Sequence, residues 1–338
     1  CVSEANEELR MKKLLKKTLK LILPVVLGGF ILFWVYRDFD FTKAGDVLLH
    51  GTNWWWMLFS LVFGVFAQVF RGWRWRQTLE PLDAFPKKSD CVNAIFISYA
   101  ASLVVPRIGE VSRCGVLAKY DNVSFAKSLG TVVTERLVDT LTILLITGIT
   151  VLLQLPIFVT FLQQTGTKIP SLVHLLTSVW FYIILFCFIG VAILLYYLRK
   201  TLFFYERVKG FVLNIWEGIM SLKGVRNIPL FIFYTLAIWA CYFLHFYFTF
   251  YCFAFTAHLG ILAALVMFVG GTFAVIVPTP NGAGPWHFAI ISMMMLYGVN
   301  VTDAGIFALI VHGIQTFLVV LLGIYGFAVL SFTNRHRG

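Results

Sequence analysis

Long apolar runs alternate with short polar stretches along most of this chain. The runs 19–36, 54–75, 128–154, 173–198, 229–255 and 304–331 are each about 18 residues or longer, enough for a helix to cross a hydrocarbon core of about 30 Å. Tryptophans flank the second run at Trp54 and Trp75, as aromatic residues do at membrane interfaces. The pattern predicts an all-α integral membrane protein with about six full transmembrane helices.

Two further apolar runs are interrupted. Residues 91–105 stop at Pro106, Gly109 follows closely, and residues 111–120 return. The run that begins at Leu259 resumes at Trp286 after a break formed by Pro278, Pro280, Asn281, Gly282 and Gly284. Irregular backbone at membrane depth is tolerated only where it is buried or lines a wet cavity. We therefore predict re-entrant helical hairpins at about 91–120 and 259–298.

The two halves of the chain show the same order of elements. Residues 12–154 and 173–331 each contain three predicted spans and one interrupted run, and an odd number of crossings turns the second copy upside down. The sequence therefore predicts an inverted repeat with opposed hairpins, joined by an external loop at 155–172. Within the second half, residues 202–223 are predicted to form an amphipathic surface helix. We interpret 1–11 as an upstream or vector-derived extension and 332–338 as a cytoplasmic tail.

Composition agrees with a membrane protein. The chain is 59% hydrophobic and 13% charged, with a mean hydropathy of +0.85 and a net charge of +11. In the predicted topology only Arg37, Lys43 and Lys168 of the 27 Lys and Arg lie outside, so both termini are expected in the cytoplasm. Membrane topology thus accounts for the basic charge, and no nucleic-acid partner is expected. Arg71, Arg74 and Arg76 are interpreted as markers of the cytoplasmic interface.

Cysteine and histidine patterns give no support for a metal site. The six cysteines are scattered without a C-x-x-C spacing, and the seven histidines form no H-x-x-x-H pair. We therefore expect no disulfide framework, no metal and no cofactor. His245, His258 and His312 are interpreted as packing residues.

The richest chemistry lies around the first hairpin and the third span. Ser128, Thr131, Glu135, Asp139 and Thr142 recur at spacings of three and four, which places them on one helical face. An ionisable side chain at bilayer depth is costly and usually marks a functional site. The candidate residues here are Arg107, Arg113, Arg136, Glu110, Glu135 and Asp139.

This cluster has two interpretations, which the sequence leaves open. Its charges can pair with one another and hold the first hairpin against the third span. Alternatively, Arg107, Arg113 and Arg136 present forked donors to a phosphate while the carboxylates balance or exchange charge. Glu110 also suits the positive end of a helix dipole. His287, near the start of the returning helix of the second hairpin, is either a phosphate or proton site or a hydrogen-bonded packing residue.

Three motifs, in this order along the chain, resemble those of the flippase-like family of the lysylphosphatidylglycerol synthase transmembrane region. They are Pro106-Arg107-Ile108-Gly109-Glu110 with Arg113, Glu135-Arg136-Leu137-Val138-Asp139, and Pro278-Thr279-Pro280-Asn281-Gly282-Ala283-Gly284. The resemblance covers about residues 20–330. It implies a protein of the bacterial inner membrane that moves lipids or lipid-linked groups between leaflets.

The chain departs from this family in two respects. Many members carry a glutamate shortly after the last glycine, where this chain has Trp286 and His287. The soluble aminoacyl-transfer domain of the bifunctional synthases is also not seen here, so we expect a transporter rather than an enzyme that makes lysyl lipid.

The expected function is therefore translocation of an anionic or aminoacylated phospholipid or a lipid-linked substrate. One alternative is a membrane transferase that uses a polyprenyl-phosphate donor, with Asp38 and Asp40 holding a divalent metal. A second is a non-catalytic membrane partner of envelope lipid enzymes. A homo-oligomer is also compatible with the sequence.

Overall fold

The structure, a computed structural model, describes residues 22–106, 108–155 and 224–333, and every regular element in these ranges is helical. A first helix, Ile22–Tyr36, precedes α2 (Phe41–Asp46). The other helices are α3 (Trp54–Leu79), α4 (Lys88–Val104), α5 (Ile108–Tyr120), α6 (Phe125–Leu153), α11 (Ile228–Tyr247), α12 (Ile261–Ala274), α13 (Pro285–Leu296) and α14 (Val301–Thr333). Short helical turns lie at Val47–Gly51, Glu80–Leu82, Phe248–Cys252 and Pro280–Gly282.

Four helical segments of the described chain are long and apolar enough to cross a membrane. They are Trp54–Leu82, Phe125–Leu153, Ile228–Cys252 and Val301–Thr333. The pair Ile22–Tyr36 and Phe41–Gly51, bent by 96°, adds a fifth if it counts as one span. The multi-pass prediction is therefore confirmed. The count of six stays a prediction, because the expected span 173–198 and the surface helix 202–223 lie outside the described residues.

The long helices expose apolar side chains and bury polar ones, the reverse of a water-soluble protein. On α6, Leu145 and Leu152 are exposed, whereas Ser128 and Glu135 on another face are fully buried. This distribution fits helices whose outer surface contacts lipid tails and whose interior holds the polar groups.

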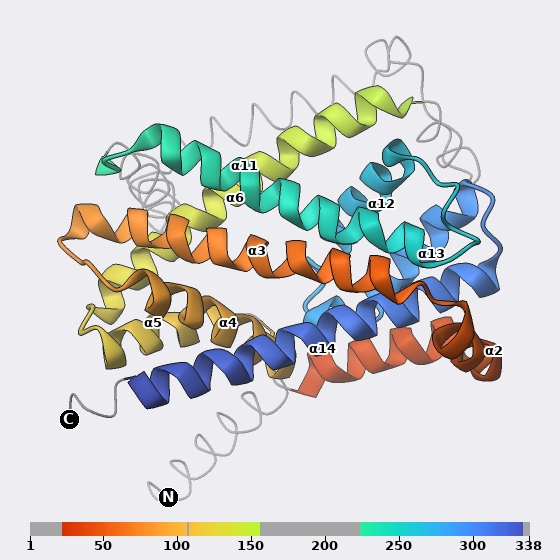
Figure 1. Cartoon of the computed structure of the whole chain (residues 1–338), viewed down its shortest axis with the longest axis horizontal. Helices are drawn as coiled ribbons and strands as arrows, with labels where there is room; N and C mark the ends of the chain where they lie inside the picture. Colours follow the sequence, from red (N-terminus) through yellow and green to blue (C-terminus); the bar gives the residue numbers. More distant parts are fainter. Residues whose placement is uncertain (1–21, 107, 156–223, 334–338) are drawn as a thin grey trace, which may run out of the picture.

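Paired short helices occupy both predicted hairpin positions (Figure 1). The helices α4 and α5 pack against each other across a turn in which the Ile108 N–H donates to the Val105 carbonyl at 3.2 Å. The helices α12 and α13 form the second pair. Because α14 contacts both α4 and α13, and α4 also contacts the Pro280–Gly282 turn, the two hairpins meet inside the molecule. Their entry from opposite membrane faces stays a prediction.

Glycines at the two hairpins have different roles. Gly282 (φ 71°) and Gly284 (φ 91°) adopt the left-handed region that glycine enters without steric cost, as expected for a tight turn. Gly109 was also expected to permit a turn, but it lies inside α5. A Cβ there would lie 2.0 Å from the Ser98 carbonyl oxygen of α4, so Gly109 allows the two helices to approach closely.

The helix α3 runs to Leu79, four residues beyond the predicted end of its span. Its N-terminus is capped by Asn53, whose side chain accepts a hydrogen bond from the Trp55 N–H at 3.2 Å. Along its length α3 lies beside α11 (Figure 1). Arg71 and Arg74, near the end of the predicted span, lie within the helix bundle and are 3% and 0% exposed.

Candidate functional site

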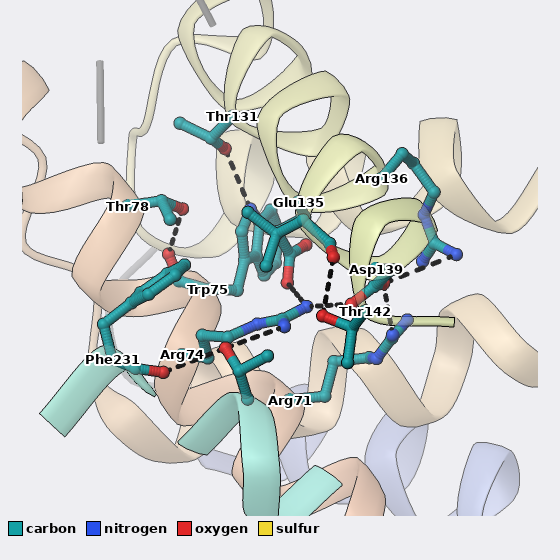
Figure 2. A network of polar contacts seen from close by, with 12 residues as sticks. Arg71, Arg74, Trp75, Thr78, Thr131, Glu135, Arg136, Asp139, Thr142 and Phe231 are labelled. Carbon is teal, nitrogen blue, oxygen red and sulfur yellow. Dashed lines mark hydrogen bonds and ion pairs between the residues drawn. The ribbon is translucent and has the colours of Figure 1, made fainter. Parts of the chain in front are cut away.

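The predicted polar face of α6 is confirmed. Ser128, Thr131, Glu135 and Asp139 are all buried on one side of this helix. The face points toward α3, whose side chains approach it closely (Figure 2). A row of buried polar groups on a membrane helix requires partners, since lipid offers none.

Two arginines of α3 supply those partners. Arg74 Nη2 lies 2.6 Å from Asp139 Oδ1 and 3.3 Å from Glu135 Oε1, and Arg71 Nη2 lies 2.5 Å from Asp139 Oδ2 (Figure 2). Arg74 also donates to Thr235 Oγ1 of α11 at 3.2 Å. Arg71 and Arg74 thus have buried partners that their interpretation as markers of the cytoplasmic interface did not include, and that interpretation stays a prediction. They neutralise carboxylates inside the bundle.

The first hairpin joins this network through Arg113 of α5. Its Nη1 atom lies 2.6 Å from Glu135 Oε2, at the distance of an ion pair but without the alignment of a hydrogen bond. The guanidinium also stacks over the ring of Trp75 at 4.6 Å, and Trp75 Nε1 donates to Thr131 Oγ1 at 2.9 Å. Arg113 thus fixes α5 against both α3 and α6.

A second link between the hairpin and α6 is more exposed. Arg136 Nε lies 2.9 Å from Glu110 Oε1, and these side chains are 44% and 37% exposed. Arg136 Nη1 lies 3.9 Å from Asp139 Oδ2. Glu110 is in the first turn of α5, as expected. Arg107 lies outside the described residues, so its predicted contact with this cluster stays a prediction.

The ion pairs match the arrangement expected of a structural network, because they hold α3, α5 and α6 together. In the described residues the network contains four arginines (Arg71, Arg74, Arg113, Arg136) and three carboxylates (Glu110, Glu135, Asp139), an excess of one positive charge. Each buried carboxylate has at least two arginine contacts. Such a network stabilises only as a complete set, because an unpaired buried charge is costly.

One edge of the network opens into a cavity of about 390 Å³. Arg71, Arg136 and Asp139 form its charged wall. The remaining wall is largely aromatic and apolar, contributed by Tyr99 of α4 and by α11, α12, α13 and α14. A pocket of this size with a few polar groups is typical of a small-molecule site. The charged face of the first half therefore faces helices of the second half across this cavity.

A second cavity of about 210 Å³ adjoins the first and reaches the turn of the second hairpin. The two share the lining residues Tyr99, Tyr242, His245, Val275, Trp286 and Gln315. The turn contributes Asn281, whose Nδ2 donates to Thr316 Oγ1 at 2.7 Å and whose carbonyl oxygen lies 3.1 Å from His312 Nε2. The prolines of the break, Pro278 and Pro280, lie in the chain around it and do not line either cavity.

His287 has a structural contact. Its Nδ1 accepts the Gly284 N–H at 3.3 Å, which caps the helix α13 in which it lies. The ring is 3% exposed and packs 4.6 Å from the His312 ring, and it lines neither cavity. The capping role matches the packing interpretation, and phosphate binding by His287 stays a prediction.

The paired acids near the first helix also have local roles. Asp40 Oδ1 accepts the backbone N–H groups of Thr42 and Lys43 and so caps α2. Asp38 Oδ2 lies 2.9 Å from Arg37 Nε. Across the described residues no three His, Cys, Asp or Glu side chains gather as metal ligands would. A divalent metal at Asp38 and Asp40 stays a prediction of the transferase alternative.

Comparison with known proteins gives one match. The family model described as "Lysylphosphatidylglycerol synthase TM region" matches residues 21–323, which include both hairpins and the charged network. Searches of curated proteins and of solved structures gave no significant match. The matched range covers most of the 338 residues. The chain therefore belongs to the family of the lysylphosphatidylglycerol synthase transmembrane region, a family of membrane proteins linked to lipid metabolism or translocation.

Proposed function

We propose that this protein is a lipid translocase that moves an anionic phospholipid or lipid-linked substrate between the leaflets of the bacterial inner membrane. The full chain would form about six spans and two opposed re-entrant hairpins related as an inverted repeat. Both termini would lie in the cytoplasm. The substrate headgroup would cross the membrane through the hollow where the two hairpins meet, while its tails stay in lipid.

One observation carries this proposal. The charged network opens, through Arg71 and Arg136, into a cavity whose opposite wall belongs to the second half of the chain. A purely structural network has no need of a hollow at its cationic edge. Transporters with broken helices commonly bind their substrate at such an interface between halves, near the middle of the membrane.

The side chains divide by burial into two roles. Arg74, Arg113 and Glu135 are fully buried and would keep the helices in place. Arg136 is half-exposed and its contact with Glu110 is accessible, so it can exchange this carboxylate for a phosphate at little cost. Glu110 would then balance the charge when the headgroup leaves. We propose that Arg107, next to this turn in the sequence, adds to the cationic wall.

Replacing Arg136 with Ala should therefore slow translocation. A charge-assisted hydrogen bond contributes about 1.5–3 kcal/mol, so the rate is expected to fall by about tenfold or more. The measurement is flipping of a fluorescent anionic phospholipid in proteoliposomes, read by chemical quenching of the outer leaflet. The matched control is Arg37→Ala, which removes an exposed arginine whose ion pair lies apart from the network. A folded Arg136→Ala protein that flips at the unaltered rate would remove Arg136 from the mechanism.

The transferase alternative rests on Asp38 and Asp40, each of which has a local partner in the structure. If it were nevertheless correct, a purified sample with a divalent metal would form product from a polyprenyl-phosphate donor, and Asp38→Asn would abolish it. A role as a non-catalytic partner of envelope enzymes would leave purified protein unable to move or alter any lipid.

A further inference from the structure

We propose that the substrate is a monoanionic phosphodiester lipid whose headgroup is uncharged and carries hydroxyl groups. This inference rests on the translocase function and specifies its substrate class. It distinguishes a polyol or sugar headgroup from an aminoacylated one or one that bears an amine.

The first argument is the charge on the cavity wall. Of the described residues that line the two adjoining cavities, Arg71 and Arg136 carry positive charges and Asp139 carries the one carboxylate. Both oxygens of that carboxylate are already engaged, Oδ1 by Arg74 and Oδ2 by Arg71. The wall therefore has a surplus of one positive charge, which one phosphodiester would neutralise. An ammonium group would instead meet two guanidinium groups, and the one carboxylate that lines these cavities is already paired.

The second argument is the chemistry of the residues away from the arginines. Buried polar atoms there lack a hydrogen-bond partner: Gln315 Nε2 and Trp239 Nε1 are unpaired donors, and Gln68 Oε1 is an unpaired acceptor. Gln315 lines both cavities, Trp239 lines the larger and Gln68 the smaller. Buried polar atoms without partners are rare in folded proteins and require an explanation.

Hydroxyl groups match this set of atoms. A hydroxyl both donates and accepts, so adjacent hydroxyls of a glycerol or a sugar can satisfy an amide N–H, an indole N–H and an amide oxygen together. An ammonium group only donates, so it can serve Gln68 Oε1 but neither of the two unpaired donors, and acylation of the glycerol also removes one of the hydroxyls that could serve them. Burying unsatisfied polar groups is unfavourable, which disfavours a cationic headgroup a second time.

The distribution of these groups fits a headgroup that extends from its phosphate. Arg71 and Arg136 line only the larger cavity, whereas Asn281 and Gln68 line only the smaller. Tyr99 and Tyr242 lie at the junction, with their hydroxyl oxygens 2.6 Å apart. A phosphate between the arginines would thus direct its substituent past the tyrosine pair toward Gln315.

Two lipid classes have this chemistry. One is a glycerophospholipid with a polyol headgroup, and the other is a sugar linked through a phosphodiester to a polyprenyl chain. The cavity residues distinguish the headgroup but not the tail, so the experiment includes both.

The test compares translocation of three tail-labelled lipids in proteoliposomes of the full chain: phosphatidylglycerol, an aminoacylated phosphatidylglycerol and a polyprenyl-phosphate hexose. We expect one of the two lipids with an uncharged headgroup to move at least about tenfold faster than the aminoacylated lipid, since one unpaired buried charge is worth at least that factor. The faster of the two identifies which of the two lipid classes is the substrate. Equal or faster movement of the aminoacylated lipid would overturn the inference.

A variant of Gln315 tests the same inference independently. Gln315→Glu replaces the unpaired amide donor with a carboxylate, so the ratio of aminoacylated to uncharged-headgroup transport is expected to rise by about tenfold. The matched control is Gln154→Glu, the same chemical change at the end of α6, where Gln154 contacts Tyr297 and lines neither cavity. An unchanged ratio in Gln315→Glu, with both proteins folded, would contradict the assignment.

Binding separates this inference from the proposed function. Native mass spectrometry of the purified protein with phosphatidylglycerol and its aminoacylated form measures headgroup preference without transport. If no lipid is translocated but phosphatidylglycerol binds more tightly, translocation fails and the headgroup assignment holds. If lipids are translocated but the aminoacylated form binds as tightly or more tightly, the assignment fails and the translocase function holds.

Discussion

Replacing Arg74 with Met is expected to lower the free energy of unfolding by about 3 kcal/mol, because the removal of one partner leaves buried carboxylates short of positive charge. The Arg74 side chain is fully buried, and its Nη2 atom contacts both Asp139 and Glu135. Methionine keeps most of the apolar stem of the arginine side chain. The loss would therefore report the missing charge and not a large cavity. Reversible unfolding in mixed micelles measures this change in the free energy of unfolding.

The matched control lies two residues further along the same helix. Arg76 pairs with Glu80 at 3.1 Å, but both side chains are partly exposed. Arg76 Nε also donates to the Pro86 carbonyl at 2.9 Å, so Arg76→Met should cost about 1–2 kcal/mol, less than the loss at Arg74. Equal losses in the free energy of unfolding for the two variants would mean that water reaches Glu135 and Asp139. The network would then not be buried.

A double variant tests the cause of the loss. Glu135→Gln removes one of the two carboxylates that Arg74 contacts. When it is combined with Arg74→Met, the free energy of unfolding should fall by about 1–3 kcal/mol less than the sum of the two single losses, as expected for groups in one network. Additive losses would show that Arg74 stabilises the fold through packing alone.

The parts of the site that sequence predicts well are those set by local periodicity. Glu135 and Asp139 could be placed on one buried face because the helical repeat fixes which residues share a side. The two hairpins could be placed because proline and glycine interrupt the apolar runs at Pro106 and around Gly282. Both features depend only on residues close together in the chain.

The buried partners of the α3 arginines were not predicted, for a physical reason. The positive-inside rule uses the position of a charge near the end of a span, and Arg71 and Arg74 lie close to the end of the apolar run. The alternative signal was present, because Gln68, Arg71, Trp75 and Thr78 recur at spacings of three and four and are buried on one face of α3. Polar residues that recur at helical spacing within a predicted span therefore indicate buried, paired arginines. The distance of an arginine from the end of the span is a weaker indicator.

Other contacts could not be predicted because they depend on helices distant in sequence. His312 was interpreted as a packing residue without polar surroundings, but it lies beside the Asn281 carbonyl across 31 residues. No motif singles out Gln315, and it lines both cavities only because α14 runs past the second hairpin. Such contacts between distant residues follow from tertiary packing and leave no local pattern in the sequence.

A substitution at Gly109 should affect both stability and transport. Gly109 lies where α5 crosses α4, and an added Cβ would lie 2.0 Å from the Ser98 carbonyl oxygen and 2.3 Å from Ser102 Oγ. The carbonyl belongs to the backbone of α4 and cannot rotate away, so the two helices must separate. Overpacking of this kind costs about 1–3 kcal/mol, and the gain in helix propensity from Ala recovers only about 1 kcal/mol. We expect Gly109→Ala to lower the melting temperature.

The control on the same helix is Gly115→Ala, where the added Cβ meets no atom within 4 Å. It should leave stability unchanged or raise it by up to about 1 kcal/mol, so the two variants are expected to differ in sign. Gly109→Ala should also slow transport, because α5 carries Glu110 and Arg113 and its displacement separates both from α6. If the two alanine variants melt and transport alike, α4 and α5 do not approach closely at Gly109, and the first hairpin does not position the charged wall of the cavity.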